Sequence, residues 1–384
     1  MNFFSYNKNI FFYLNFRKKL NKPKPKVYPL VEKKIKNIKK LVSNTIGKKI
    51  IPTTTISLGS KEIIHHINSE NHYNYSIFYP SNSTIIKYND EYIINIRYVN
   101  YVIHDISNQD VKYDGKYNDN EVVFISINKY VKLNSRFQEI ESKWLDVDFK
   151  KADEMINYRT NKMIESTREI VIGIEDIRLY NFNSSIKYMG SLRVDPYTTS
   201  IVMGDYNYCN LNNYNIMNSN NLTYENNCKH HLTSCEKNWS FVDLNNELHV
   251  VYKWYPIQIC SIYDNSINLT REIVSPIFFK KMRGSSCASK FNNNIWFLTH
   301  IVDTDLLGNG LGKYFHVFVI FDSDLNLIKY SQPFTFDDKL IEFCVGLIVE
   351  EENILMTHSI YDNSSILGIY NRVNLVNSLG WVCL

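Results

Sequence analysis

The chain has few of the residues that interrupt or cross-link a fold. Its 384 residues include 13 Gly, 9 Pro and 7 Cys, and no two cysteines form a Cys-x-x-Cys motif. An odd number of scattered cysteines argues against a disulfide framework and is typical of a reducing compartment, so we expect an intracellular protein. The chain also lacks a Gly-rich nucleotide-binding loop and an Asp-x-Asp motif in a βα context. These absences argue against a glycan-building transferase and against dinucleotide or ATP use.

The N-terminal region has no apolar run long enough to cross a bilayer. The stretch IFFYLNF at 10–16 is too short, and no signal-peptide cleavage site is clear. Positive charge dominates instead, because residues 1–50 hold 14 Lys or Arg and one acid, which leaves 29 basic and 38 acidic residues in the remainder. We predict a basic extension over 1–50, with a short amphipathic helix around 31–43, followed by one domain over 51–384.

The basic extension has two candidate roles. It is either a solvated arm or a contact for an acidic partner or a membrane surface, which would make an intracellular protein surface-associated. No specific nucleic-acid partner is expected.

One group of thiols and imidazoles is a candidate zinc site. It comprises Cys228, His230, His231 and Cys235, with Cys209 upstream. Thiolate and imidazole groups are zinc ligands, but this spacing matches no common zinc module. We therefore expect no metal and no organic cofactor.

From about residue 50 onward, short runs rich in Ile, Val, Tyr and Phe alternate with polar turns. Such runs favour β-strands, and turns such as FNSS (182–185), SDLN (323–326) and EEEN (350–353) separate them. The clearest runs are 92–103, 122–127, 169–182, 200–208, 248–255, 294–302, 314–321, 340–349 and 354–361. The segment 150–168 is either a helix or a loop. Many short strands at near-regular spacing indicate a sandwich, a barrel or a propeller. The length of about 330 residues favours the propeller, with on the order of five to seven blades.

The run IGIEDIRLY at 172–180 places charged side chains inside an apolar strand. In an extended strand residues i and i+2 share a face, so Asp176 and Arg178 are expected to project together while Glu175 points the other way as a structural partner. A carboxyl beside a guanidinium suits acid/base or phosphate chemistry. The alternative is a structural ion pair.

Further polar residues interrupt other apolar strands. In a propeller the innermost strands of all blades converge on one axis, so these residues are expected to meet around a polar ligand. Arginine, lysine and histidine together form an anion site, and carboxylates beside them supply proton transfer. As alternatives, the arginines are ion-pair partners and the histidines are satisfied core residues. The residues are Arg97, Lys237, Arg283, His300, His316, Glu342 and Asp362.

Several aromatic residues lie near these charged positions in the sequence. Trp239, Trp254, Tyr255 and Trp296 either stack on sugar faces or belong to the core.

The order of these motifs resembles glycoside hydrolase family 130, the five-bladed propellers that include mannoside phosphorylases and mannosidases. The resemblance covers about residues 85–370. It rests on Arg97, GIEDIR at 173–178, EKNW at 236–239, RGSS at 283–286, His300, and Phe343 to Gly346 followed by Asp362. GIEDIR departs from the family's GxEDPR, with Ile177 in place of Pro, and RGSS replaces a Gly-Gly-Thr-Pro type of turn.

The resemblance implies an all-β, five-bladed propeller that acts on a mannoside-like glycan. It implies that Asp176 is the general acid, and that Arg178, Lys237, Arg283 and His300 hold phosphate or sugar hydroxyls. Phosphorolysis would use inorganic phosphate as co-substrate, whereas inverting hydrolysis needs a second carboxylate, for which Glu236, Glu342 and Asp362 are candidates. The alternative is a non-catalytic propeller that binds glycan or protein and is tethered through residues 1–50.

Overall fold

The computed structural model describes most of the chain after residue 46. The described ranges are 47–67, 73–103, 111–113, 123–145, 170–195, 198–208, 210–219, 222, 234–303 and 312–384. The chain divides into two units, Met1–Ser43 and Asn44–Leu384. Outside the described residues lie the predicted helix at 31–43, the segment 150–168 and four members of the candidate zinc cluster, namely Cys209, Cys228, His230 and His231. Within the described ranges no helix is long and apolar enough to span a membrane.

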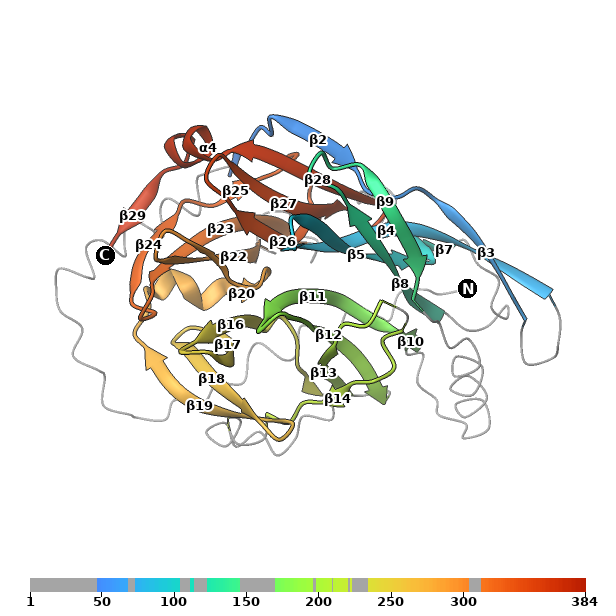
Figure 1. The fold of residues 1–384 in the computed structure, drawn as a ribbon, viewed down its shortest axis with the longest axis horizontal. Coiled ribbons are helices and arrows are strands. Elements are labelled where there is room, and N and C mark those ends of the chain that lie inside the picture. The colour runs from blue at the N-terminus through green and yellow to red at the C-terminus, as the bar shows by residue number, and fades with distance from the viewer. Residues whose placement is uncertain are drawn as a thin grey trace, which may run out of the picture. The chain divides into compact units, whose positions relative to one another are not determined.

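The second unit is built almost entirely of β-strands, as predicted (Figure 1). Its first sheet contains β3 (Glu62–Ile67), β4 (Tyr73–Tyr88), β5 (Glu91–Val99), β8 (Val123–Leu133), β9 (Glu139–Trp144) and β10 (Ile170–Ile172). The second contains β11 (Ile174–Phe182), β12 (Ser185–Asp195), β13 (Thr198–Asp205), β14 (Asn215–Ile216) and β15 (Ser234–Cys235). The third contains β16 (Ser240–Leu244), β17 (Glu247–Trp254), β18 (Ile257–Tyr263) and β19 (Ser266–Ile273).

Two further sheets complete the succession of sheets along the chain. The fourth contains β20 (Met282–Gly284), β21 (Ser289–Phe291), β22 (Asn294–Asp303), β23 (Lys313–Asp322), β24 (Leu327–Ser331) and β25 (Phe334–Thr335), with β1 (Lys48–Lys49) and β29 (Trp381–Cys383). The fifth contains β26 (Glu342–Val349), β27 (Asn353–Ile360), β28 (Ser364–Asn371) and β2 (Thr54–Ser57). The remaining elements are the pair β6 (Tyr101–Ile103) and β7 (Val111–Tyr113), the 3-10 helix Ile277–Lys281 and α4 (Arg372–Ser378).

The sheets have a propeller-like arrangement, and their apolar faces meet. One core cluster joins the first and fifth sheets, with Ile94 and Leu355 fully buried. Others join the first and second sheets through Ile177, and the second and third through Trp239. The predicted all-β propeller-like fold is therefore confirmed. Four blades are recognised in it, not the five that were predicted. The fourth sheet departs from a plain meander because β20 and β21 both pair with β22.

Asparagine and aspartate close many of the hairpins. Asn89–Asp90, Asn245–Asn246 and Asn292–Asn293 all have positive φ, between 45° and 63°. Two consecutive residues with positive φ are what a type I′ turn requires, and Asn adopts this conformation more readily than most residues. The Asn-rich composition therefore has a structural use in the tight turns.

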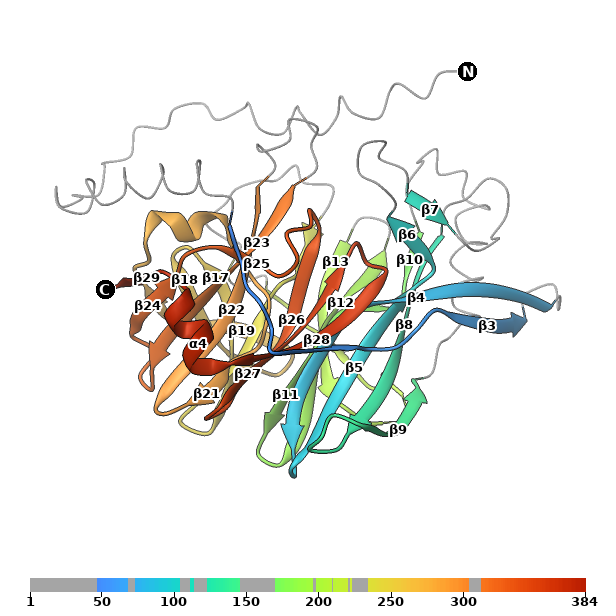
Figure 2. The ribbon, with the colours of Figure 1, turned by 90° about the horizontal axis from the view of Figure 1, so that it is seen from above.

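Strands from the N-terminal part of this unit complete sheets from its C-terminal part. β2 pairs antiparallel with β28, and β1 pairs parallel with β25 (Figure 2). Ile50 and Leu58, which flank β2, are 2% and 4% exposed. Residues 48–58 are thus part of the folded body, and they cover edges that the C-terminal strands would otherwise expose.

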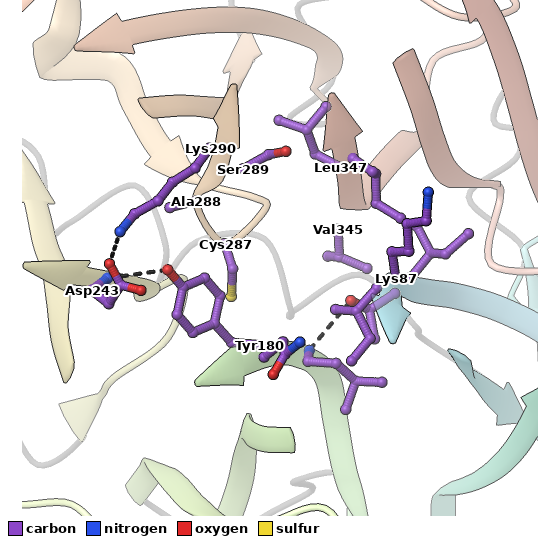
Figure 3. Close-up of a pocket in the computed structure, with 15 residues that line it drawn as sticks. Lys87, Tyr180, Asp243, Cys287, Ala288, Ser289, Lys290, Val345 and Leu347 are labelled. Carbon is purple, nitrogen blue, oxygen red and sulfur yellow. Dashed lines mark hydrogen bonds and ion pairs between the residues drawn. The ribbon is translucent and has the colours of Figure 1, made fainter. Parts of the chain in front are cut away.

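The innermost segments of the five sheets end together around one cavity of about 330 Å³ (Figure 3). Its lining comes from 84–87, 179–181, 243, 287–290 and 345–348, one group from each sheet. Asp176 and Arg178 come just before the lining residues of β11, and Glu342 comes just before those of β26. On β11 and β26 the predicted site residues therefore lie toward the start of the strand, before the residues that line this cavity.

Candidate active site

The acid pair lies at an irregular point of β11. The pairing of β11 with β12 shifts register between Glu175 and Arg178, and Asp176 has a φ of 52°. A non-glycine residue with positive φ inside a strand is strained, and such strain is common at functional sites. The bulge breaks the alternation on which the predicted facing of these side chains was based.

Arg97 binds both carboxylates of the pair. Its Nη1 donates to Asp176 Oδ1 at 3.0 Å, its Nη2 to Glu175 Oε1, and its Nε to Ser126 Oγ at 2.9 Å. Asn82 Nδ2 also donates to Asp176 Oδ1, at 2.7 Å. The expectation that Glu175 points away from Asp176 is therefore wrong, because the bulge turns both carboxylates toward one guanidinium.

Arg178 is fully buried behind the pair and contacts neutral acceptors. Its Nε donates to Ser285 O at 2.6 Å, its Nη1 to the Asp176 carbonyl oxygen at 3.0 Å, and its Nη2 to Asn238 Oδ1 at 3.3 Å. Burial lowers the pKa of Arg178 from its usual value. Arg178 thus joins the second, third and fourth sheets at the site, and no described contact pairs it with the Asp176 carboxylate.

The two acids have opposite tendencies to hold a proton. Burial raises the pKa of Glu175, and although Arg97 opposes this, the pKa stays above the ordinary value. Burial also tends to raise the pKa of Asp176, but Arg97, Arg178 and the Asn82 amide outweigh it, so this pKa lies below the ordinary value. In the free protein a proton is therefore held more readily by Glu175 than by Asp176.

Asp362 is placed next to this cluster by one residue of β4 and one of β6. Ser81 Oγ donates to Asp362 Oδ1 and Tyr101 OH to Asp362 Oδ2, each at 3.0 Å. Ser81 is adjacent to Asn82, which holds Asp176. The negative charge of Asp362 helps to raise the pKa values of Arg97 and Glu175. The Asp362 carboxylate is therefore close enough to interact electrostatically with both residues.

The two predicted histidines are buried and neutral. His300 Nδ1 lies 2.9 Å from Ser285 Oγ, and its ring stacks on Tyr314. Burial, followed by the charges of His316 and Arg283, lowers the pKa of His300 well below its usual value. Burial lowers the pKa of His316 to about 3, and its Nε2 accepts from the backbone N–H of Cys344 at 3.3 Å. Neither imidazole carries a positive charge at neutral pH.

Three other predicted residues make structural contacts. Glu342 is fully buried and accepts from the backbone N–H groups of Phe336, Asp337 and Lys339 at 2.6–2.8 Å. Glu236 accepts from Ser219, Tyr252 and the indole of Trp239, and Trp239 is 1% exposed in a core cluster. Both carboxylates and the indole N–H of Trp239 are therefore hydrogen-bonded within the protein. The catalytic role of Glu342 and the sugar contact of Trp239 stay predictions.

Lys237 and Arg283 line a second cavity, of about 590 Å³, together with Asn238 and Gly284, whose oxygens accept from Arg178. Lys237 is close enough for its charge to lower the pKa values of Glu175 and Asp176. Gly284 lets β20 approach the backbone at Asn238 closely, because any larger residue would place its Cβ 2.3 Å from Asn238 O. This close approach sets Arg283 and Lys237 along the same cavity.

The sequence did not indicate the neutral residues that position the charged ones. Asn82, Ser81, Ser126, Asn238 and Ser285 supply hydrogen bonds to Asp176, Asp362, Arg97 and Arg178. The run PSNST at 80–84, polar inside a strand, was a signal that could have found the first two. Among the described residues no group of three or more His, Cys, Asp or Glu could hold a metal ion.

Comparison with solved structures places the fold among carbohydrate-active propellers. A glycosyl hydrolase from Bacteroides ovatus is 12% identical and matches over 86% of this chain and 95% of its own, with a TM-score of 0.52. The chain has the fold of this glycoside hydrolase. The predicted resemblance is confirmed at the level of the fold.

Two further solved structures are similar to this chain at lower TM-scores. β-1,2-Mannobiose phosphorylase from Listeria innocua is 12% identical over 78% of this chain and 92% of its own, with a TM-score of 0.47. A structure described with the GH130 family of mannoside phosphorylases is 12% identical over 85% of this chain and 97% of its own, with a TM-score of 0.49. No protein-family model matches the chain, and no curated protein matches it by sequence. Because one fold hosts many chemistries, function is argued from the site.

Proposed function

We propose that this protein is a carbohydrate-active enzyme that cleaves a mannoside-like glycoside, with Asp176 as the general acid. The observation that carries the proposal is the strained Asp176, held by Arg97 and Asn82 where the innermost strands meet. A carboxyl fixed in this way is prepared to deliver a proton to one position of a bound ligand. The motif resemblance assigns the same role to this residue.

We further propose that the five sheets close into one ring. β4 contacts β11 and β26, β11 contacts β16, β17 contacts β20, and β22 contacts β26. The sheets therefore follow one another around a closed ring. This closure explains why residues as distant in sequence as Asn82, Asp176 and Ser359 are hydrogen-bonded.

The exposed cations Lys237 and Arg283, together with the ionised state of Asp176 in the free protein, favour phosphorolysis over hydrolysis. In the free protein its lowered pKa keeps the carboxyl ionised at neutral pH, which is unsuitable for an acid. A bound phosphate dianion would raise this pKa by repulsion and at the same time provide the nucleophile. The phosphate oxygen would attack the anomeric carbon, the glycosidic C–O bond would break, and the leaving oxygen would take the proton from Asp176.

The side chains around the acid have separate roles in this proposal. Arg97 positions Asp176 and Glu175, and Arg178 fixes the backbone of the bulge. Lys237 and Arg283, exposed at the adjoining cavity, attract phosphate, and the neutral His300 orients a hydroxyl by hydrogen bonding. Inorganic phosphate is the one co-substrate proposed.

Hydrolysis remains the second candidate, and it depends on Asp362. Of the three candidate second carboxylates, Glu342 and Glu236 are committed to structural hydrogen bonds, whereas Asp362 lies beside the acid pair. Inversion by water needs a second carboxylate about 6.5–9.5 Å from the acid. A glycan-binding propeller without catalysis is the outcome if bound sugars are never cleaved.

The proposal is tested by incubating the full chain with a panel of neutral manno-oligosaccharides, with and without inorganic phosphate. Phosphate-dependent release of a mannosyl phosphate is the expected result, because the unpaired cations beside Asp176 suit an anionic nucleophile. Free mannose formed equally well without phosphate would indicate hydrolysis. Sugar binding without any product would overturn the enzymatic proposal.

A further inference from the structure

The cavity of about 590 Å³ beside the acid pair extends beyond the residues assigned to catalysis. From Asn238 and Gly284, whose oxygens accept from Arg178, it runs outward past Lys253, Tyr255 and Lys280. Its size lies within the range of about 300–1,000 Å³ that is typical of organic ligands. Lys237 links the cavity to the acid pair, because it lines the cavity and its charge also acts on Glu175 and Asp176.

Positive charge dominates the lining of this cavity. Lys237, Lys253, Lys280 and Arg283 are all exposed, and within the described part of the chain none of the four forms an ion pair. The single carboxylate of the lining, Glu236, already accepts from Ser219 at 2.9 Å, Tyr252 at 3.0 Å and Trp239 at 3.2 Å. No carboxylate of the described residues thus neutralises these four positive charges, and an anionic ligand would do so.

The cavity also has an aromatic lining. Tyr255 is 39% exposed, whereas Tyr252, Trp254 and Phe279 are buried and form its wall. The Lys253 ammonium lies 5.1 Å from the centroid of the Tyr252 ring. An exposed aromatic face next to cations suits a sugar unit that carries a charged group, since the ring accepts the apolar face of the sugar while the cations bind the anion.

We propose that this cavity is a subsite for a phosphorylated sugar unit, so that the substrate is a phosphate-bearing saccharide. The inference rests on the proposed function, because it places the scissile bond at Asp176 and the phosphate ester in the cavity. Lys253 and Lys280 belong to no motif of the family resemblance, and they are the residues that extend the anion site outward. Inorganic phosphate alone would leave most of the cavity and its aromatic wall unused.

The test is calorimetric binding of mannose 6-phosphate, mannose and inorganic phosphate to the full chain. We expect mannose 6-phosphate to bind at least about tenfold more tightly than either other ligand, and the affinity to fall with rising salt. The double variant Lys253→Gln/Lys280→Gln should weaken mannose 6-phosphate about tenfold or more. The control is Lys290→Gln, which removes a lysine from the other cavity and should change nothing.

Three results would overturn the inference. Mannose 6-phosphate could bind no more tightly than mannose, inorganic phosphate could bind as tightly as the sugar phosphate, or the double variant could bind like wild type. The proposed function is judged separately by turnover of neutral and of phosphate-bearing manno-oligosaccharides. Cleavage without preferential sugar-phosphate binding refutes the subsite alone, and preferential binding without cleavage of any glycoside refutes the enzymatic proposal alone.

Discussion

At the scale of single residues, the site depends on one backbone irregularity. The positive φ of Asp176 costs on the order of 1–3 kcal/mol, which the surrounding hydrogen bonds must offset. Because of this conformation, the consecutive acids Glu175 and Asp176 both bind the guanidinium of Arg97. Strand alternation alone sends such residues to opposite faces, so the sequence identified the acids but not their joint contact with Arg97.

The acid pair predicts a pH-dependent stability. Because the pKa of Glu175 is raised in the folded protein, its contribution is full below the unfolded value of about 4.3 and is lost as pH rises through the folded pKa. Glutamine does not titrate, so Glu175→Gln removes this pH-dependent loss of stability. The melting temperature of this variant relative to wild type should therefore increase as pH rises above about 4.3, as measured by thermal unfolding.

Asp176→Asn provides the opposite control for this measurement. The lowered pKa of Asp176 stabilises the folded protein above the unfolded value of about 3.9, and that contribution is lost as pH falls. The melting temperature of this variant relative to wild type should decrease as pH rises. A difference from wild type that stays constant with pH, for both variants, would contradict the assigned directions.

At the scale of elements, the sequence predicted the strands that alternate or are wholly apolar. β22 and β23 carry NIWFLTHIVD and KYFHVFVIFD and are buried along almost their whole length. β19 was not predicted, because SINLTREI is mostly exposed and resembles a loop. The blade count was equally hard to predict, since strands as short as β25, with two residues, leave no periodic signal.

The same limit applies to the site. Arg97, Asp176 and Arg178 were recognisable because a charge in an apolar strand is costly, and the structure brings them together. Ser285 and Asn238 were not, because a neutral residue near a turn has many uses and only the folded ring places them beside Arg178.

The hairpin turns give a prediction about stability. Asn246 ends the β16–β17 turn with a φ of 63°. Asn246→Ala should destabilise the protein by about 1–2 kcal/mol in urea unfolding, because alanine resists the left-handed region, whereas Asn246→Gly should be neutral or slightly stabilising. Asn374→Ala, on the exposed face of α4, is the matched control and should have little effect. Equal stability of the Ala and Gly variants at 246 would refute the assigned turn.

At the scale of the whole molecule, sheets from the end of the chain are completed by strands from its beginning. A protein lacking residues 1–43 retains β1, β2 and the buried Ile50 and Leu58, so its melting temperature should match that of the full chain. A protein lacking residues 1–58 exposes the edges of β25 and β28 and should melt several degrees lower or aggregate. Identical melting of the two truncated proteins would show that these strands do not close the fold.

The catalytic role of Asp176 is the central claim, and turnover by Asp176→Asn tests it most directly. The measurement is kcat on a manno-oligosaccharide that the wild-type protein cleaves, with Asp205→Asn, an exposed aspartate of β13, as the matched control. Loss of the general acid should lower kcat by about 10²–10⁴-fold while the control retains wild-type turnover. Unchanged turnover of a folded Asp176→Asn protein would contradict the account.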